Sequence, residues 1–283
     1  MVDAPTLRTV AASDGYAFQV ATWPGQGPTR GRVVVLHGVQ SHEGWYRGLG
    51  RTLAESGYET HFPDRRGSGA NLVDRGHANS ARRLLDDVVE VLQPLRASHP
   101  PRPTALAGIS WGGKLAAIVA GEHPELVDAL ALIAPGLHPR VGVPLPDRLR
   151  IAMAYFLNRH RRFPIPLADP ALFTASPEGQ TFIASDPHSI REATAGLLAA
   201  SVFIDRMVRR MPPRIEQPSL LMLAGRDRIV DNAKTAAYFA TLAARDRTTI
   251  NDPEAHHTLE FEPDPTRYAR DLVAWLDLRF PTP

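Results

Sequence analysis

The feature that most constrains this chain is a Gly-x-Ser-x-Gly pentapeptide, Gly108–Gly112, set between an apolar run and a run of small residues. This order predicts a strand, a tight turn and a helix. Such a turn brings the helix close to the strand it leaves, so glycines on both sides of Ser110 supply the necessary room. Ser110 is then exposed where unpaired N–H groups of the helix start can stabilise an anion. The segment predicts a nucleophilic serine beside half of an oxyanion hole, and the flanking strand and helix argue against a plain glycine-rich turn.

The composition narrows the class of protein. A chain of 283 residues, 43% hydrophobic and 22% charged, can bury one large core or a core with an insertion. The net charge of +2 gives no reason to expect a nucleic-acid partner. The absence of cysteine excludes disulfides and a thiol nucleophile. No signal peptide is apparent and no apolar run approaches the roughly 18 residues of a membrane span, so we expect a cytoplasmic protein.

Apolar runs alternate with helical patterns along most of the chain. Strands are predicted at 6–12, 16–22, 32–36, 59–63, 105–107, 130–134, 219–223 and 248–251. Helical spacing or helix-start signals mark 43–56, 80–97, 232–244 and 266–279, and Asp231 is placed to cap the third of these helices. Short buried strands alternating with helices predict an α/β fold with a mostly parallel, doubly wound sheet.

The alternation stops between residues 137 and 213. This segment contains many prolines and helical patterns without convincing strands, and Ser189–Glu192 has the spacing of a capping box. We interpret it as an inserted helical lid between two parts of the core, 1–136 and 214–283. Its apolar residues are expected mostly to pack the lid against itself and the core, with a few lining an apolar slot: Phe156, Phe173, Phe182, Phe203, Leu172, Leu198 and Met207.

A serine hydroxyl needs a base within hydrogen-bond reach and a third group that orients the base. Asp227 and a histidine, His256 or His257, each follow a predicted strand, and such loops meet at the edge of the sheet where Ser110 lies. Physical reasoning alone leaves the two histidines equivalent. Asp227 is preferred to Asp231 as the acid because Asp231 has a capping position. The order serine, aspartate, histidine is the order found in α/β-hydrolases.

Four motifs resemble those of α/β-hydrolases of the monoacylglycerol lipase and lysophospholipase group, also described as serine aminopeptidase-like. They are His37–Tyr46, Asp64–Gly69, the Gly108–Gly112 elbow, and the loops that contain Asp227 and His257. The resemblance spans nearly the whole chain and implies the α/β-hydrolase fold. The chain departs from the family at the elbow, where Ile109-Ser110-Trp111 replaces the usual His-Ser-Met, and after His37-Gly38, where the family favours small residues. These departures concern the choice of substrate.

The resemblance also assigns residue roles. The family's loop has leucine two residues and glutamate five residues after the catalytic histidine, which selects His257. The backbone N–H groups of Val39 and Trp111 are implied as the oxyanion donors, with the Trp111 ring as a wall of the pocket. His37 and His42 are expected to brace the oxyanion loop.

The implied activity is that of a serine carboxylic-ester hydrolase on monoacylglycerol, lysophospholipid or similar small-molecule acyl esters, with no cofactor and no metal. The alternatives are a peptidase resembling proline iminopeptidase, a thioesterase, an acyltransferase, and, from another class, a non-catalytic binding module. A peptidase needs lid carboxylates to hold the substrate amine, and the candidates are Asp169, Glu178, Asp186 and Glu192.

The basic cluster Arg159–Arg162 in the predicted lid suits a phosphate headgroup or a membrane surface, although a solvated arginine face is the commoner use of such residues. We therefore expect at most peripheral membrane contact, through the lid. The sequence leaves the oligomeric state open.

Overall fold

A computed structural model describes residues 4–280 of the chain. An eight-stranded sheet runs through it in the order β1-β2-β4-β3-β5-β6-β9-β10. Its first two strands form an antiparallel hairpin that also joins β4 antiparallel, and the remaining pairs are parallel. The predicted, mostly parallel sheet is thus confirmed. The strands are β1 Thr6–Ala11, β2 Ala17–Trp23, β3 Gly31–Leu36, β4 Tyr58–Pro63, β5 Thr104–Ile109, β6 Ala129–Ile133, β9 Ser219–Ala224 and β10 Arg247–Asp252.

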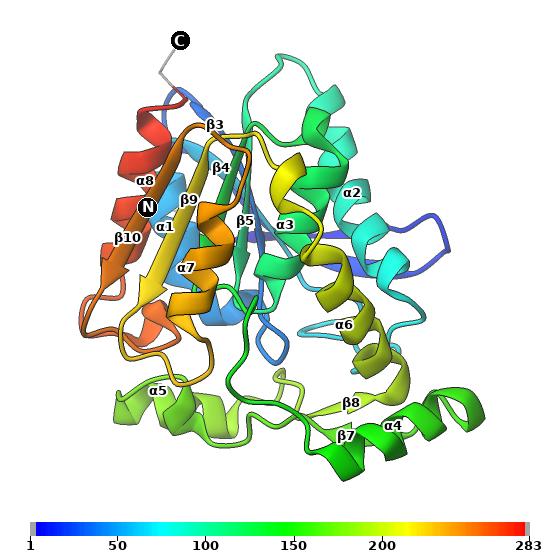
Figure 1. The fold of residues 1–283 in the computed structure, drawn as a ribbon. Helices are drawn as coiled ribbons and strands as arrows, with labels where there is room; N and C mark the ends of the chain where they lie inside the picture. The colour runs from blue at the N-terminus through cyan, green and yellow to red at the C-terminus, as the bar shows by residue number, and fades with distance from the viewer. Residues whose placement is uncertain (1–3, 281–283) are drawn as a thin grey trace.

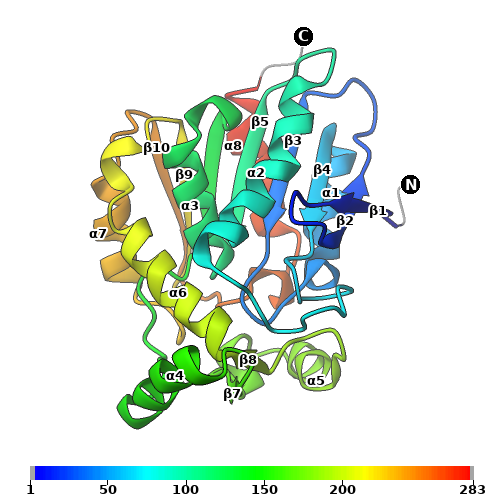
Figure 2. The same ribbon diagram turned by 90° about the vertical axis from the view of Figure 1, so that its right-hand side faces the viewer.

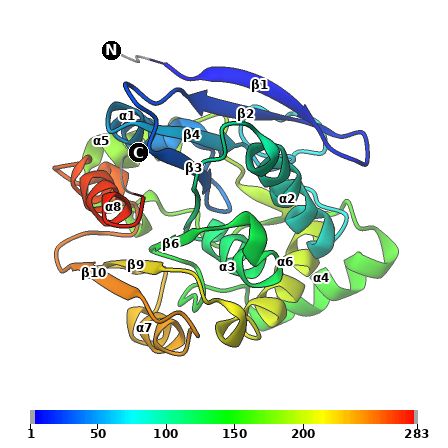
Figure 3. The same cartoon turned by 90° about the horizontal axis from the view of Figure 1, so that it is seen from above.

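Helices cover both faces of the sheet (Figure 3). One face carries α1 Arg47–Glu55 and α8 Arg267–Asp277, and the other carries α2 Ala81–Ala97, α3 Gly112–Glu122 and α7 Asn232–Ala240. Because β3, β5, β6 and β9 lie between these layers, all their residues are buried. This explains why their sequences are continuous apolar runs instead of alternating ones.

The segment 137–213 lies across the carboxyl ends of the parallel strands (Figures 1 and 2). It contains α4 Leu145–Leu157, β7 Arg162–Pro164, α5 Pro177–Ser185, β8 Glu192–Thr194 and α6 Ala195–Val208. The expectation of helices without strands was wrong, because β7 and β8 form an antiparallel pair. Each strand is only three residues long, which is too short for an alternating pattern to be visible in the sequence.

The capping-box prediction at Ser189–Glu192 was also wrong. The helix begins at Ala195, and its cap is Thr194, whose hydroxyl accepts a hydrogen bond from the Leu197 N–H. The Ser189 hydroxyl instead donates to the Asp186 carboxylate at 2.6 Å, and Glu192 belongs to β8. Ser189 is therefore engaged by a carboxylate three residues before it, and Glu192 by its pairing with β7.

Smaller differences concern one helix end and the exposure of aromatic side chains. α7 ends at Ala240, four residues before the predicted end, while Asp231 caps its start as predicted. The side chains of Phe156 and Phe203, which were expected to pack the insertion or line a slot, are 83% and 46% exposed, and Phe182, which is 38% exposed, still packs against the Trp45 ring. Between residues 4 and 280, the helices are all too short or too polar to cross a membrane.

Candidate active site

The elbow has the strained geometry that its glycines predict. Ser110 joins β5 to α3 with φ of +51°, a conformation that non-glycine residues rarely adopt. A Cβ on Gly108 would lie 2.6 Å from Gly113 Cα, so the helix does pass against the strand. Hydrogen bonds from the Gly113 and Gly136 N–H groups to the Ser110 carbonyl, at 3.0 and 2.7 Å, hold the turn.

The structure brings Ser110, His257 and Asp227 into one hydrogen-bonded chain. His257 Nε2 lies 2.9 Å from Ser110 Oγ, and His257 Nδ1 lies 2.7 Å from Asp227 Oδ2. The other Asp227 oxygen accepts from the N–H groups of Ile229 and Val230 at 2.7 and 2.9 Å. With Nδ1–H donated to the carboxylate, Nε2 of the neutral ring is left as an acceptor for the serine proton.

The rival residues point elsewhere. His256 turns to Glu262, with Nδ1 at 3.2 Å from the carboxylate, while the adjacent His257 faces the serine. Asp231 accepts from the Lys234 N–H and caps α7. The geometry therefore distinguishes His257 from His256, which physical reasoning from the sequence could not do.

The two predicted oxyanion donors flank the serine. The chain after β3 passes directly beside it, since a Cβ on Gly38 would lie 3.4 Å from Ser110 Cβ. Trp111 is the residue before the first turn of α3. Among residues 4–280, the N–H groups of Val39 and Trp111 have no protein acceptor, so both remain available to a ligand oxygen.

The two histidines expected to brace this loop do so in different ways. His37 Nε2 accepts from the Arg65 N–H at 2.9 Å, and Nδ1 donates to the Gly38 carbonyl at 2.8 Å. His42 extends to the insertion instead, where its Nε2 lies 3.0 Å from Asp186 Oδ2. Burial lowers the pKa of His37 well below its ordinary value, which keeps this ring neutral.

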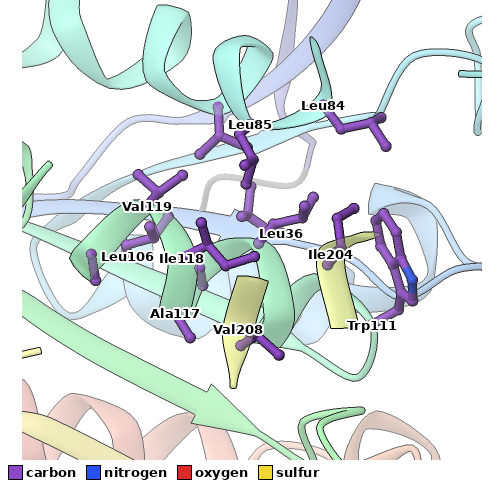
Figure 4. Close-up of a cluster of buried hydrophobic side chains, with 14 of the residues drawn as sticks. Leu36, Leu84, Leu85, Leu106, Trp111, Ala117, Ile118, Val119, Ile204 and Val208 are labelled. Carbon is purple, nitrogen blue, oxygen red and sulfur yellow. The ribbon is translucent and has the colours of Figure 1, made fainter. Parts of the chain in front are cut away.

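A cavity of about 10 Å³ adjoins Ser110 and His257. Its lining includes Leu167 and Phe173 of the insertion together with Trp45 and Tyr46, and the Phe173 and Trp45 rings pack edge to face with their centres 5.7 Å apart. The Trp111 ring is not part of this wall, which corrects the expectation. It lies in the hydrophobic core beside Ile204 of α6 (Figure 4), and its indole N–H donates to Ser201 Oγ at 2.9 Å.

The remaining candidate residues of the insertion do not line this cavity. Asp186 is held by Trp45, His42 and Ser189, and the other three carboxylates considered for a peptidase are exposed. The arginines of the basic cluster are exposed as well; Arg159 donates to the Asn79 carbonyl, and Arg161 lies over the Phe163 ring.

Sequence reasoning missed one group at this site, the Arg65 side chain. Its guanidinium is buried against the Gly38 and Val39 carbonyls. The Asp64–Gly69 motif was recognised, but no local pattern shows which of its side chains turns toward the serine.

Comparisons with known proteins agree with this architecture. A family model described as serine aminopeptidase, S33, matches residues 27–264. The monoacylglycerol lipase of Mycolicibacterium smegmatis is 22% identical over 95% of this chain and 96% of that protein. The monoglyceride lipase of Mus musculus is 23% identical over 96% of this chain and 91% of that protein.

Solved structures share the fold. A monoacylglycerol lipase from Paleococcus ferrophilus superimposes with a TM-score of 0.81 at 22% identity, covering 92% of this chain and 98% of that chain. A soluble variant of a Saccharomyces cerevisiae monoglyceride lipase in complex with a substrate analogue gives a TM-score of 0.85 at 20% identity. That alignment covers 100% of this chain and 98% of the yeast chain. These likenesses identify the α/β-hydrolase fold.

Proposed function

This chain belongs to the serine aminopeptidase S33 family, and on that premise we propose that it is a serine hydrolase that cleaves acyl esters such as monoacylglycerol or lysophospholipid. The observation that carries the proposal is the hydrogen-bonded chain from Asp227 through His257 to Ser110. Relatives named monoacylglycerol and monoglyceride lipases align over nearly the whole chain and favour esters with a single acyl group.

In the acylation step, Ser110 Oγ attacks the ester carbonyl carbon while His257 Nε2 takes the hydroxyl proton. The carbonyl π electrons move to the oxygen, and the Val39 and Trp111 N–H groups stabilise the resulting oxyanion. The oxyanion then collapses, the bond to the alcohol oxygen breaks, and His257 returns the proton to that oxygen. The alcohol leaves, and the acyl group remains on Ser110.

Deacylation repeats these steps with water as the nucleophile. His257 Nε2 takes a proton from water, the hydroxide oxygen adds to the acyl carbon, and collapse returns the proton to Ser110 Oγ and releases the carboxylic acid. Asp227 carries its negative charge throughout. It stabilises the imidazolium at each proton transfer and holds the ring in the tautomer that leaves Nε2 free.

Substrate entry requires the insertion to move. A cavity of about 10 Å³ holds about one water molecule, whereas ligand pockets usually measure about 300–1,000 Å³. Leu167 and Phe173 belong to the insertion and occupy the space beside the serine, so their displacement opens room for an acyl chain. This supports the interpretation of residues 137–213 as a lid.

The first experiment measures a burst of p-nitrophenol from p-nitrophenyl acyl esters, followed by steady turnover. The burst is expected with the natural chain and not with Ser110→Ala. An unchanged rate in that variant would refute the proposal. A folded wild-type chain that fails to react with a fluorophosphonate would favour a binding module instead.

Fluorophosphonates with short and long alkyl chains test the acyl slot. Labelling by both is expected if the lid opens, while labelling by the short probe alone contradicts long-chain substrates. The leaving group is tested with matched p-nitrophenyl esters, acyl thioesters and proline amides. Faster turnover of the amides would favour the peptidase, although none of its candidate carboxylates lines the cavity.

An exposed apolar face on α4 supports peripheral membrane contact through the lid. Leu149 and Phe156 are 67% and 83% exposed, and Arg148 and Arg150 are exposed on the same helix. Apolar side chains flanked by arginines suit an anionic lipid surface. We expect the protein to sediment with phosphatidylcholine vesicles that contain phosphatidylglycerol, and Phe156→Gln to weaken this binding.

Leu278→Gln is the matched control for that experiment, because Leu278 is 82% exposed just beyond α8, far from α4 (Figure 1). Equal binding by the wild type and Phe156→Gln would contradict the α4 contact. Arg159→Ala and Arg161→Ala test the headgroup separately: a selective rise in KM for lysophospholipid over monoacylglycerol is expected if these residues bind phosphate.

A further inference from the structure

One buried guanidinium group contacts both segments that carry the predicted oxyanion donors. Arg65 follows β4 and is 9% exposed. Its Nη1 donates to the Gly38 carbonyl at 3.2 Å, and its Nη2 donates to the Val39 carbonyl at 2.9 Å. The guanidinium carbon lies 4.9 Å from the centre of the Trp111 ring. Ser68 Oγ accepts a further hydrogen bond from Nη2 at 2.6 Å, which fixes the fork of the side chain.

The contact of Arg65 with the Gly38 carbonyl sets the direction of the Val39 N–H, because both groups belong to the same peptide unit. In a planar trans peptide the C=O and N–H bonds point in opposite directions. The Gly38 carbonyl accepts from both Arg65 Nη1 and His37 Nδ1. The Val39 N–H is therefore directed away from Arg65. Because this peptide passes beside Ser110, its N–H can face an oxyanion formed there.

The same hydrogen bonds strengthen the donor. A cation at a carbonyl oxygen withdraws electron density through the peptide, so the N–H of that peptide becomes a better hydrogen-bond donor. Burial lowers the pKa of Arg65 to about 10, so the guanidinium remains charged at neutral pH. The second donor is held by a different contact, since the Trp111 ring lies against Arg65 and hydrogen-bonds to Ser201 of α6.

We propose that Arg65 is a positioning residue that aligns the two oxyanion donors, orienting the peptide of Gly38 and Val39 through its carbonyl and holding Trp111 by stacking. The proposal rests on the proposed function, since it concerns the oxyanion of that reaction. Arg65 does not line the cavity beside Ser110, so it acts through the two backbone donors and not on the substrate.

The test compares Arg65→Met and Arg65→Lys with a matched control, Arg32→Met. Arg32 is 5% exposed and donates to the Leu95 carbonyl at 2.9 Å, but it lies at the opposite end of β3 from the site. The maximal rate and KM are measured with a p-nitrophenyl ester. The maximal rate is divided by the concentration of sites that react with a fluorophosphonate, which gives kcat per reactive serine. Inhibition is measured with an alkyl trifluoromethyl ketone. Ser110 Oγ adds to the carbonyl carbon of this ketone, so the enzyme–inhibitor complex contains a tetrahedral oxyanion.

Loss of a complete oxyanion donor lowers kcat by about 10²–10³. We expect Arg65→Met to lower kcat by about 100-fold and to raise the inhibition constant of the ketone by a similar factor, with KM little changed. Arg65→Lys keeps the charge without the planar fork, so a loss of about 10-fold is expected. Arg32→Met is expected to be less stable than the wild type but to keep the wild-type kcat and the wild-type inhibition constant of the ketone.

If Arg65→Met folds and has the wild-type inhibition constant for the ketone, the proposal is overturned. That result would mean that removing Arg65 does not affect binding of the oxyanion, as expected for an arginine with a purely structural role. The proposal also fails if Arg32→Met loses as much activity per reactive site. If Arg65→Met does not fold, Arg65→Lys decides, and an unchanged inhibition constant there counts against the role. A wild-type chain that reacts with neither ester nor fluorophosphonate contradicts the proposed function itself.

Discussion

The replacement Asp227→Asn tests how the structure fixes the tautomer of His257. Asp227 Oδ1 accepts two backbone hydrogen bonds, from Ile229 and Val230, at 2.7 and 2.9 Å. In asparagine only the amide oxygen can keep these bonds, so the amide NH₂ must face His257 Nδ1. Two donors then oppose one another across the 2.7 Å contact. The ring relieves this by moving its proton to Nε2, which can no longer accept the proton of Ser110.

The expected cost follows from that tautomer change. In serine hydrolases with this arrangement, the wrong tautomer lowers kcat by about 10⁴, equivalent to about 5.5 kcal/mol in the activation free energy. KM should change little, because Asp227 is enclosed behind His257, its side chain 0% exposed, and contacts no substrate. The assay is the pre-steady-state burst of p-nitrophenol, with the reactive serine counted by fluorophosphonate labelling.

Asp231→Asn is the matched control, since asparagine caps a helix about as well as aspartate. It should retain wild-type kcat and stability. A kcat for Asp227→Asn within tenfold of the wild type, with the protein folded, would show that Asp227 does not set the tautomer.

Three further predictions follow from the geometry. His257→Ala should abolish the burst while His256→Ala keeps it, because only His257 faces the serine; the reverse result in stopped-flow assays would exchange their roles. Gly108→Ala should destabilise the fold or prevent folding, seen as a lower Tm or insoluble protein, because its Cβ would lie 2.6 Å from Gly113 Cα; a Tm equal to the wild type would contradict the close approach. Burial raises the pKa of Glu260 from 4.5 to about 7, so its contribution to stability is greatest below about pH 4.5 and declines as pH rises to about 7. The free energy of unfolding in urea is measured for the wild type and for Glu260→Gln. The difference between the two should fall by about 3 kcal/mol as the pH rises from 4.5 to 7, and a difference that does not change with pH would contradict the raised pKa.

Residues with the same local surroundings show the limits of the sequence. His256 and His257 are adjacent in one loop. Glu262 contacts the His256 ring and Asp227 contacts the His257 ring, and these contacts decide which histidine faces the serine. Ser189 and Thr194 are both suitable helix caps, and only the carboxylate of Asp186 explains why Ser189 does not act as one. Asp227 is 30 residues from His257, so a distant side chain decided the first case, whereas Asp186 is only three residues from Ser189, so a local competitor for the hydroxyl decided the second.

The sequence by itself determined the features that depend on local chemistry. Glycines around Ser110 fixed the elbow because no other residue fits so tight a turn, and continuous apolar runs fixed the buried strands because both faces of the sheet are covered. Asp231 likewise fixed the start of α7 through a cap within its own turn. Only the tertiary structure decided which side chains meet, namely His257 with Ser110 and Arg65 with both oxyanion segments. The physical reason is that hydrogen bonds between distant segments depend on how helices and strands pack, which local sequence patterns do not encode.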